Sequence, residues 1–74
     1  MVESEWRQRV VCEPDLHHGE PCIRGTGIPV SILVAILADA TLEELLAEYP
    51  QLMREDVQAA LLYAAEASHN TLVA

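Results

Sequence analysis

Seven consecutive apolar residues, Ile32 to Ala38, constrain the fold of this chain more than any other feature. Ser31 precedes them and belongs to a residue type that caps helices, so the run predicts a helix that extends through roughly Asp39. A helix with apolar side chains all around is normally buried on every side. A chain of 74 residues offers little material to cover it completely. We therefore expect a homodimer or a larger homo-oligomer.

The segment before this run predicts a small β-hairpin or β-like arm. Residues 10–12 and 22–23 are short β-prone pieces, and residues 28–30 form a third. Pro21 and Pro29 lack a backbone N–H, which keeps their positions out of a central strand. If the arm and the apolar helix form the subunit interface, its predicted residues are Val10, Val11, Ile23, Ile28, Ile32, Leu33 and Ile36.

A second, amphipathic helix is predicted to begin at a capping box. Thr41 and Glu44 have the required spacing, in which the Thr hydroxyl accepts from the Glu44 N–H and the Glu carboxylate reaches back. Tyr49 and Pro50 end the helix, because a residue that precedes proline disfavours the helical conformation. The apolar residues recur at helical spacing and predict one buried stripe: Leu42, Leu45, Leu46 and Tyr49.

A third helix is predicted from near Arg54 to about Ala67. Glu55 and Asp56 fall in its first turn, where carboxylates interact favourably with the helix dipole. Its predicted apolar stripe is Val57, Ala60, Leu61, Ala64 and Ala65.

These segments predict a mainly α, three-helix, helix-turn-helix-like domain, of the homeodomain-like or winged-helix-like kind, with a short N-terminal β-like arm or hairpin. The length favours a single domain, over residues 9–68. We expect residues 1–8 to be a flexible tail with Trp6 as its one anchor, and residues 69–74 to fray.

The charge balance restricts the partners that the chain can bind. Its net charge is −8, with four arginines and no lysine. Nucleic-acid phosphates repel such a chain unless its few cations cluster, whereas a basic protein partner suits it. No basic stretch followed by an apolar one stands at the N-terminus and no apolar run could span a bilayer, so we expect a cytoplasmic protein.

Four potential metal ligands fall close together: Cys12, His17, His18 and Cys22. Their spacing lacks the tight pair of cysteines found in common structural zinc sites, so zinc is a weak alternative. A disulfide between the two cysteines across a hairpin is another. The favoured interpretation is one buried thiol, one half-buried thiol and two solvent-facing histidines, with no cofactor. A domain this small also offers little cleft for catalysis, so we expect no enzyme activity.

The stretch from Arg24 to Gly27 joins the arm to the first helix, and two interpretations compete. In one, Arg24 and Thr26 bind an anion just ahead of a helix N-terminus. In the other, which we favour, Gly25 and Gly27 take positive φ angles in a turn that Pro29 continues, and Arg24 pairs with a nearby carboxylate.

The pattern Gly-x-Pro-x-Ile-Arg-Gly-Thr-x-Ile-Pro-Val, over residues 19–30, and Tyr-Pro-x-Leu, over residues 49–52, resembles the small prokaryotic DUF family 433. The resemblance covers about residues 9–67. It implies a helix-turn-helix-like domain, usually dimeric or larger, that looks like the antitoxin encoded beside a PIN-like ribonuclease toxin. Glu20 and Gly27 replace the basic residues usual there, and Met53 replaces the usual capping Ser or Thr, whose loss costs about 1 kcal/mol.

We therefore predict a non-catalytic antitoxin-like protein that self-associates and binds a basic partner, for which a PIN-like nuclease is the candidate. The alternative is a helix-turn-helix DNA-binding regulator of its own operon. The start of the third helix would then meet base edges, although Glu55 and Asp56 oppose phosphates. The DNA-binding candidates are Arg24, Thr26, Gln51, Arg54 and Gln58.

Overall fold

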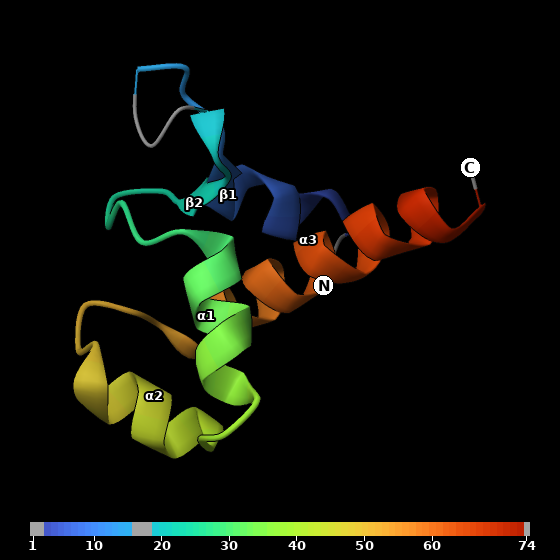
Figure 1. Cartoon of the computed structure of the whole chain (residues 1–74). Helices are drawn as coiled ribbons and strands as arrows, with labels where there is room; N and C mark the ends of the chain where they lie inside the picture. The colour runs from blue at the N-terminus through green and yellow to red at the C-terminus, as the bar shows by residue number, and fades with distance from the viewer. Residues whose placement is uncertain (1–2, 16–18, 74) are drawn as a thin grey trace.

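The structure is a computed structural model that describes the backbone of residues 3–15 and 19–73 and the side chains of residues 5–15 and 19–69. Its elements follow in the order η1 (Glu3–Arg9), β1 (Val10–Val11), β2 (Cys22–Ile23), α1 (Val30–Leu37), α2 (Leu42–Glu48) and α3 (Arg54–Val73). The three α-helices and the short hairpin confirm the predicted fold class (Figure 1).

The hairpin is antiparallel, with Val10 opposite Ile23 and Val11 opposite Cys22. Pro29 extends it, because this residue forms an isolated bridge with Cys22. Proline is tolerated there because the position lies at the edge of the small sheet. The pairing confirms the predicted arm and places the turn at residues 24–27 directly before α1.

Side chains from every element after β1 form the hydrophobic core. Its buried members are Ile23, Val30, Leu33, Leu45, Leu52, Val57 and Ala60. Helix α1 contacts both α2 and α3, so these helices cover much of the apolar run that seemed to need a second subunit (Figure 1).

Two of the predicted interface residues, Ile23 and Leu33, are instead core residues that are fully buried within the single chain. Ile32 is 45% exposed, and Val10, Val11, Ile28 and Ile36 are partly exposed, so these five stay available.

Helix α1 begins two residues earlier than predicted. Pro29 occupies the N-cap position with φ −65° and ψ 143°, and no side chain caps the helix. Ser31 is therefore not the cap, and its hydroxyl donates instead to the carboxylate of Glu20. The fixed φ of proline suits the entry to a helix, where its missing N–H costs nothing.

Helix α2 follows the prediction closely. Thr41 Oγ1 accepts from the Glu44 N–H at 3.1 Å, and the Glu44 carboxylate accepts from the Thr41 N–H at 2.8 Å. The reciprocal pair is a complete capping box. Leu45 is buried, and the rest of the predicted stripe packs against the core while partly exposed: Leu42, Leu46 and Tyr49.

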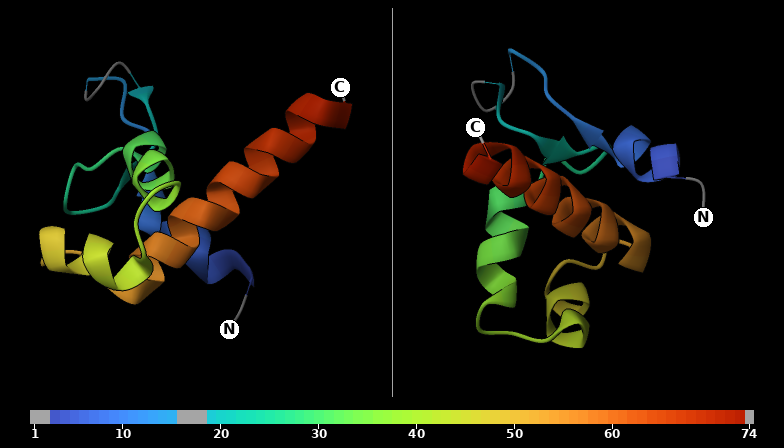
Figure 2. Two further views of the ribbon diagram at one scale, coloured as in Figure 1. Left: turned by 60° about the horizontal axis from the view of Figure 1, so that its bottom comes forward. Right: turned by 90° about the vertical axis from the view of Figure 1, so that its right-hand side faces the viewer.

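Helix α3 is longer than predicted, and its buried face matches the predicted stripe at Val57, Ala60 and Ala64 but not throughout. It continues past Ala67 to Val73, and its last turns project beyond the body of the protein (Figure 2). Leu61 is 45% exposed and Ala65 is also exposed, so their assignment to the core is wrong. Asp56 and Ala59 are buried in their place.

We expected the N-terminal segment to be a flexible tail. Residues 3–9 instead form the 3-10 helix η1, which lies along α3 (Figure 2). Trp6 is 6% exposed, and the guanidinium of Arg7 stacks over its ring at 4.6 Å. Arg7 also pairs with Glu66 of α3. Residues 3–9 therefore pack against α3 and do not form a separate tail.

The burial pattern predicts unequal effects of two leucine substitutions. Leu33→Ala removes a fully buried side chain and should lower the free energy of unfolding by about 2–5 kcal/mol. Leu61→Ala, at an exposed position of α3, should change it by less than about 1 kcal/mol. Chemical denaturation of both variants measures the difference, and equal destabilisation would contradict the assigned core.

Candidate interaction site

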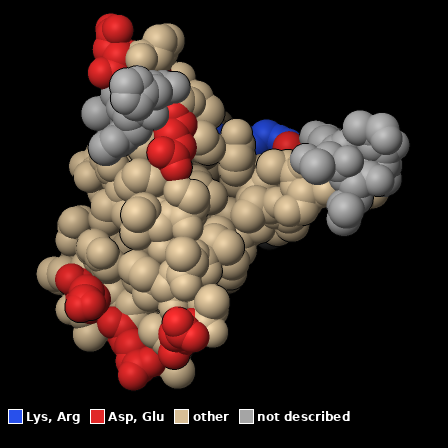
Figure 3. All heavy atoms as spheres, in the orientation of Figure 1, with Lys and Arg blue, Asp and Glu red and all other residues tan. Residues whose placement is uncertain are grey.

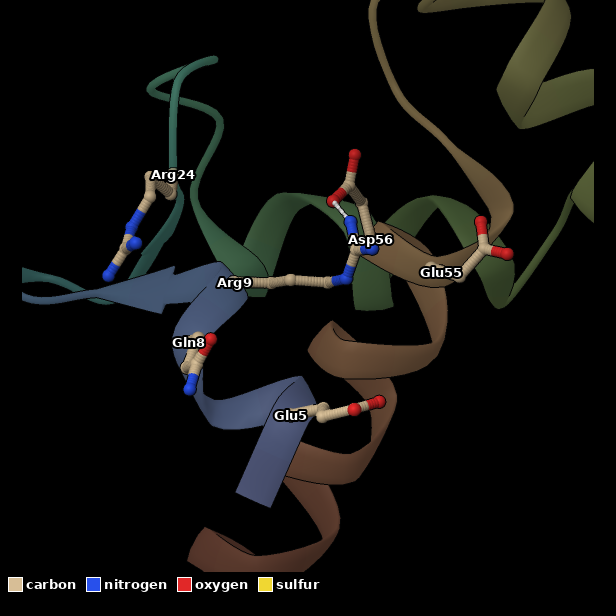
Figure 4. Close-up of a pocket in the computed structure, with 6 residues that line it drawn as sticks. All are labelled: Glu5, Gln8, Arg9, Arg24, Glu55 and Asp56. Atoms are coloured by element: carbon tan, nitrogen blue, oxygen red, sulfur yellow. Dashed lines mark hydrogen bonds and ion pairs between the residues drawn. The ribbon is translucent and has the colours of Figure 1, made fainter. Parts of the chain in front are cut away.

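A polar pocket of about 430 Å³ lies where η1, the turn after β2 and the first turn of α3 meet (Figure 4). Its lining contains two arginines, three carboxylates and one amide: Arg9, Arg24, Glu5, Glu55, Asp56 and Gln8. The pocket therefore collects charged side chains from segments that are distant in the sequence.

Arg9 and Asp56 form a hydrogen-bonded ion pair in this pocket. Arg9 Nη1 donates to Asp56 Oδ1 at 2.9 Å (Figure 4). The other oxygen of Asp56 accepts from the backbone N–H of Met53 at 2.9 Å. A charge-assisted hydrogen bond of this kind is shorter and stronger than a neutral one. The carboxylate thus joins the N-terminal segment to the start of α3.

The bond between Asp56 and the Met53 N–H explains how α3 begins although the residue at its N-cap position, Met53, cannot cap the helix with its side chain. The carbonyl of Met53 accepts the first helical bonds, from Asp56 N–H at 3.0 Å and Val57 N–H at 3.3 Å. Met53 has no side-chain acceptor, but Asp56 supplies the reciprocal half of a capping box. The cost expected from Met53 is therefore offset in part by Asp56.

The turn at residues 24–27 is fixed by its own hydrogen bonds. Thr26 Oγ1 donates to the Ile23 carbonyl at 3.1 Å and accepts from the Ile28 N–H at 3.1 Å. Gly25 and Gly27 have φ angles of 83° and 71°, which confirms the geometry predicted for them. Because both sides of the Thr26 hydroxyl are used inside the turn, this residue serves the local structure.

Arg24 does not form the ion pair that we expected. Its backbone N–H donates to the Arg9 carbonyl at 2.8 Å, but its exposed guanidinium has no hydrogen-bond or carboxylate partner among the described residues. The other three arginines of the chain each have one: Arg7 with Glu66, Arg9 with Asp56, and Arg54 with Glu43 at 4.0 Å. The turn is held by its backbone and by Thr26, and the Arg24 side chain contributes no bond to it.

The remaining DNA-binding candidates lie apart from this pocket. Gln51 is exposed in the connection between α2 and α3, and Arg54 and Gln58 are exposed on the first turns of α3. Their surroundings are acidic: α2 exposes Glu43, Glu44 and Glu48, and the charged side chains seen in this region of Figure 3 are acidic.

The cysteines are both free, with Cys12 exposed and Cys22 buried. Burial and the nearby Glu20 carboxylate raise the pKa of the Cys22 thiol, which donates to the Glu20 carbonyl at 3.3 Å. Burial and a hydrogen bond with Cys12 raise the pKa of Tyr63. No metal-binding cluster occurs within residues 3–15 and 19–73, and His17 and His18 lie outside the described residues.

Sequence reasoning placed Arg24 correctly at a turn but missed the pocket. Glu5, Gln8 and Arg9 were assigned to the tail or its boundary, and no local pattern marks them as neighbours of α3. Asp56 carried a usable signal, because an acid three residues after the start of a helix can reach back to its first N–H.

The sequence matches the family model described as protein of unknown function (DUF433) over residues 10–64. The chain is also similar to the crystal structure of a DUF433 member protein from Anabaena variabilis, with 35% identity and a TM-score of 0.78. That match covers 90% of this chain and 67% of the other. No curated protein matches. The chain therefore belongs to the DUF433 family, as its motifs suggested.

Within the described residues, no helix combines the length and the apolar character needed to cross a membrane.

The role of Asp56 predicts a graded series of substitutions. Asp56→Asn keeps an oxygen for the Met53 N–H but loses the charge, and should lower the free energy of unfolding by about 1.5–3 kcal/mol. Asp56→Ala also removes the cap and should cost about 1 kcal/mol more. Arg9→Gln combined with Asp56→Asn should be less destabilising than the sum of the two single changes, because both remove the same contact.

Thermal and chemical unfolding of the four variants provides the measurement, and Arg54→Gln is the control because its ion pair is long and exposed. Strict additivity of Arg9→Gln and Asp56→Asn would show that the two side chains do not act together.

Proposed function

We propose that this protein is a non-catalytic, antitoxin-like module that self-associates and binds a basic partner protein, with a PIN-like ribonuclease toxin as the candidate. The observation that carries the proposal is the distribution of charge. The net charge is −8, and three of the four arginines are already paired with carboxylates of the same chain. A surface of this kind attracts a basic protein and repels a free nucleic acid.

Exposed apolar side chains support the self-association. Ile32, Met53, Leu61 and Leu62 are each more than 40% exposed. A groove of about 470 Å³ also runs between α1 and α3, with Val34, Ala35 and Ala64 in its walls. Small side chains permit close approach of another helix, and burying such surface is favourable.

A second candidate function is DNA binding by a helix-turn-helix-like regulator. It rests on the order of α2 and α3 and on the exposure of Gln51 in the connection between them and of Arg54 and Gln58 at the start of α3. Glu43 and Glu55 flank these residues and oppose phosphates. A basic partner bound to the acidic surface could supply the missing positive charge.

The proposal predicts a complex with the product of the adjacent gene. Co-expression followed by affinity purification and light scattering should give a stable complex, and the chain alone should be a dimer or larger. The double variant Glu43→Gln/Glu48→Gln, which neutralises exposed acids of α2, should associate about tenfold more slowly at low salt.

Glu13→Gln/Asp15→Asn is the matched control, since it removes the same charge from an exposed loop far from α2 in the chain. Equal slowing in both variants would show that net charge matters and the α2 surface does not. The absence of any complex, together with a mobility shift of the promoter duplex by the chain alone, would favour the DNA-binding function.

A further inference from the structure

Arg24 is the one arginine of the chain whose guanidinium lacks a partner among the described residues. The chain contains four basic side chains and twelve acidic ones, so an intramolecular partner would be easy to provide. Figure 4 shows the side chain at the edge of the pocket, with Arg9 directed away from it toward Asp56. The donors of Arg24 are therefore available to a group outside the chain.

The base of the Arg24 side chain is held in place on both sides. Ile23 before it is fully buried, and the Arg24 N–H is bonded to the Arg9 carbonyl at 2.8 Å. After it, the turn is closed by Gly25 with φ 83° and by both hydrogen bonds of Thr26. A donor on a fixed backbone loses little freedom on binding, which favours recognition.

The surroundings of Arg24 select the chemical class of the bound group. Glu5 and Glu55 line the same pocket and are exposed, while Asp56 is occupied by Arg9. The lining thus carries two positive and three negative side chains, which gives a net charge of −1. Nucleic acid brings rows of phosphates, which Glu5 and Glu55 repel. A protein surface can instead present a carboxylate to Arg24 and cations to the two glutamates.

We propose that this pocket is a docking site for the partner protein, in which Arg24 binds an Asp or Glu side chain of the partner and Glu5 and Glu55 bind adjacent Lys or Arg side chains. A guanidinium binds a carboxylate through two parallel hydrogen bonds, which gives the contact directional specificity. The inference rests on the proposed partner-binding function and assigns it a location on the molecule.

The test compares Arg24→Gln with Arg54→Gln, because both arginines are exposed but only Arg24 lines the pocket. Calorimetric titration with the purified product of the adjacent gene should show at least a tenfold weaker Kd for Arg24→Gln and less than a twofold change for Arg54→Gln. The melting temperature of Arg24→Gln should equal that of the wild type, because no intramolecular bond of the side chain is lost.

Glu5→Gln/Glu55→Gln should also weaken the complex, whereas a phosphate-binding pocket would be strengthened by the same change. A fluorescent duplex of the upstream region serves as the nucleic-acid probe. If Arg24→Gln binds the partner with wild-type affinity, the docking site is wrong but the proposed function is not contradicted. If Arg24→Gln loses only its binding to the duplex, the docking site is also wrong. Failure of the wild-type chain to bind the partner would overturn both.

Discussion

The contact between Arg9 and Asp56 joins the N-terminal segment of this small protein to the start of α3. Arg9 belongs to η1 at the point where β1 begins, and Asp56 lies in the first turn of α3. The same carboxylate caps α3 through the Met53 N–H, and the carbonyl of Arg9 accepts the Arg24 N–H. The two residues of this ion pair thus also bond to the start of the longest helix and to the base of the turn that carries Arg24. Because Asp56 is 7% exposed, its charge is costly unless both oxygens are satisfied, and they are.

This arrangement separates the charges that are paired within the chain from Arg24, for which we propose a partner outside the chain. Arg7 and Arg9 are hydrogen-bonded to carboxylates of the same chain and Arg54 lies 4.0 Å from Glu43, whereas Arg24 emerges from a turn that needs no help from its side chain. The protein thus presents an acidic exterior with a single guanidinium that has no carboxylate partner among the described residues. A surface of that pattern suits a protein with mixed charges better than a nucleic acid, which is the physical basis of the proposed function.

Local signals in the sequence were sufficient for much of the fold. The capping box of Thr41 and Glu44, the turn glycines and the arm depend on residues near one another in the chain, and all are present. The errors concern contacts between distant segments. Leu61 fits the stripe of an isolated helix, but in the folded chain, where η1 also packs against α3, Leu61 is exposed and Ala59 is buried. The expected ion pair of Arg24 is not found among the described residues for a similar reason. The composition gives the number of acidic residues but not their positions in the fold.

Amide hydrogen exchange in the wild type and in Arg9→Gln tests the coupling between these segments most directly. The substitution keeps the backbone carbonyl that accepts from Arg24 but removes the guanidinium that positions Asp56. We predict that exchange of the Met53 and Arg24 amides accelerates together, by about tenfold or more, while exchange of the Glu44 amide in the distant capping box is unchanged. Faster exchange at Met53 with full protection of Arg24 would show that the turn and α3 are organised independently, and would contradict the account.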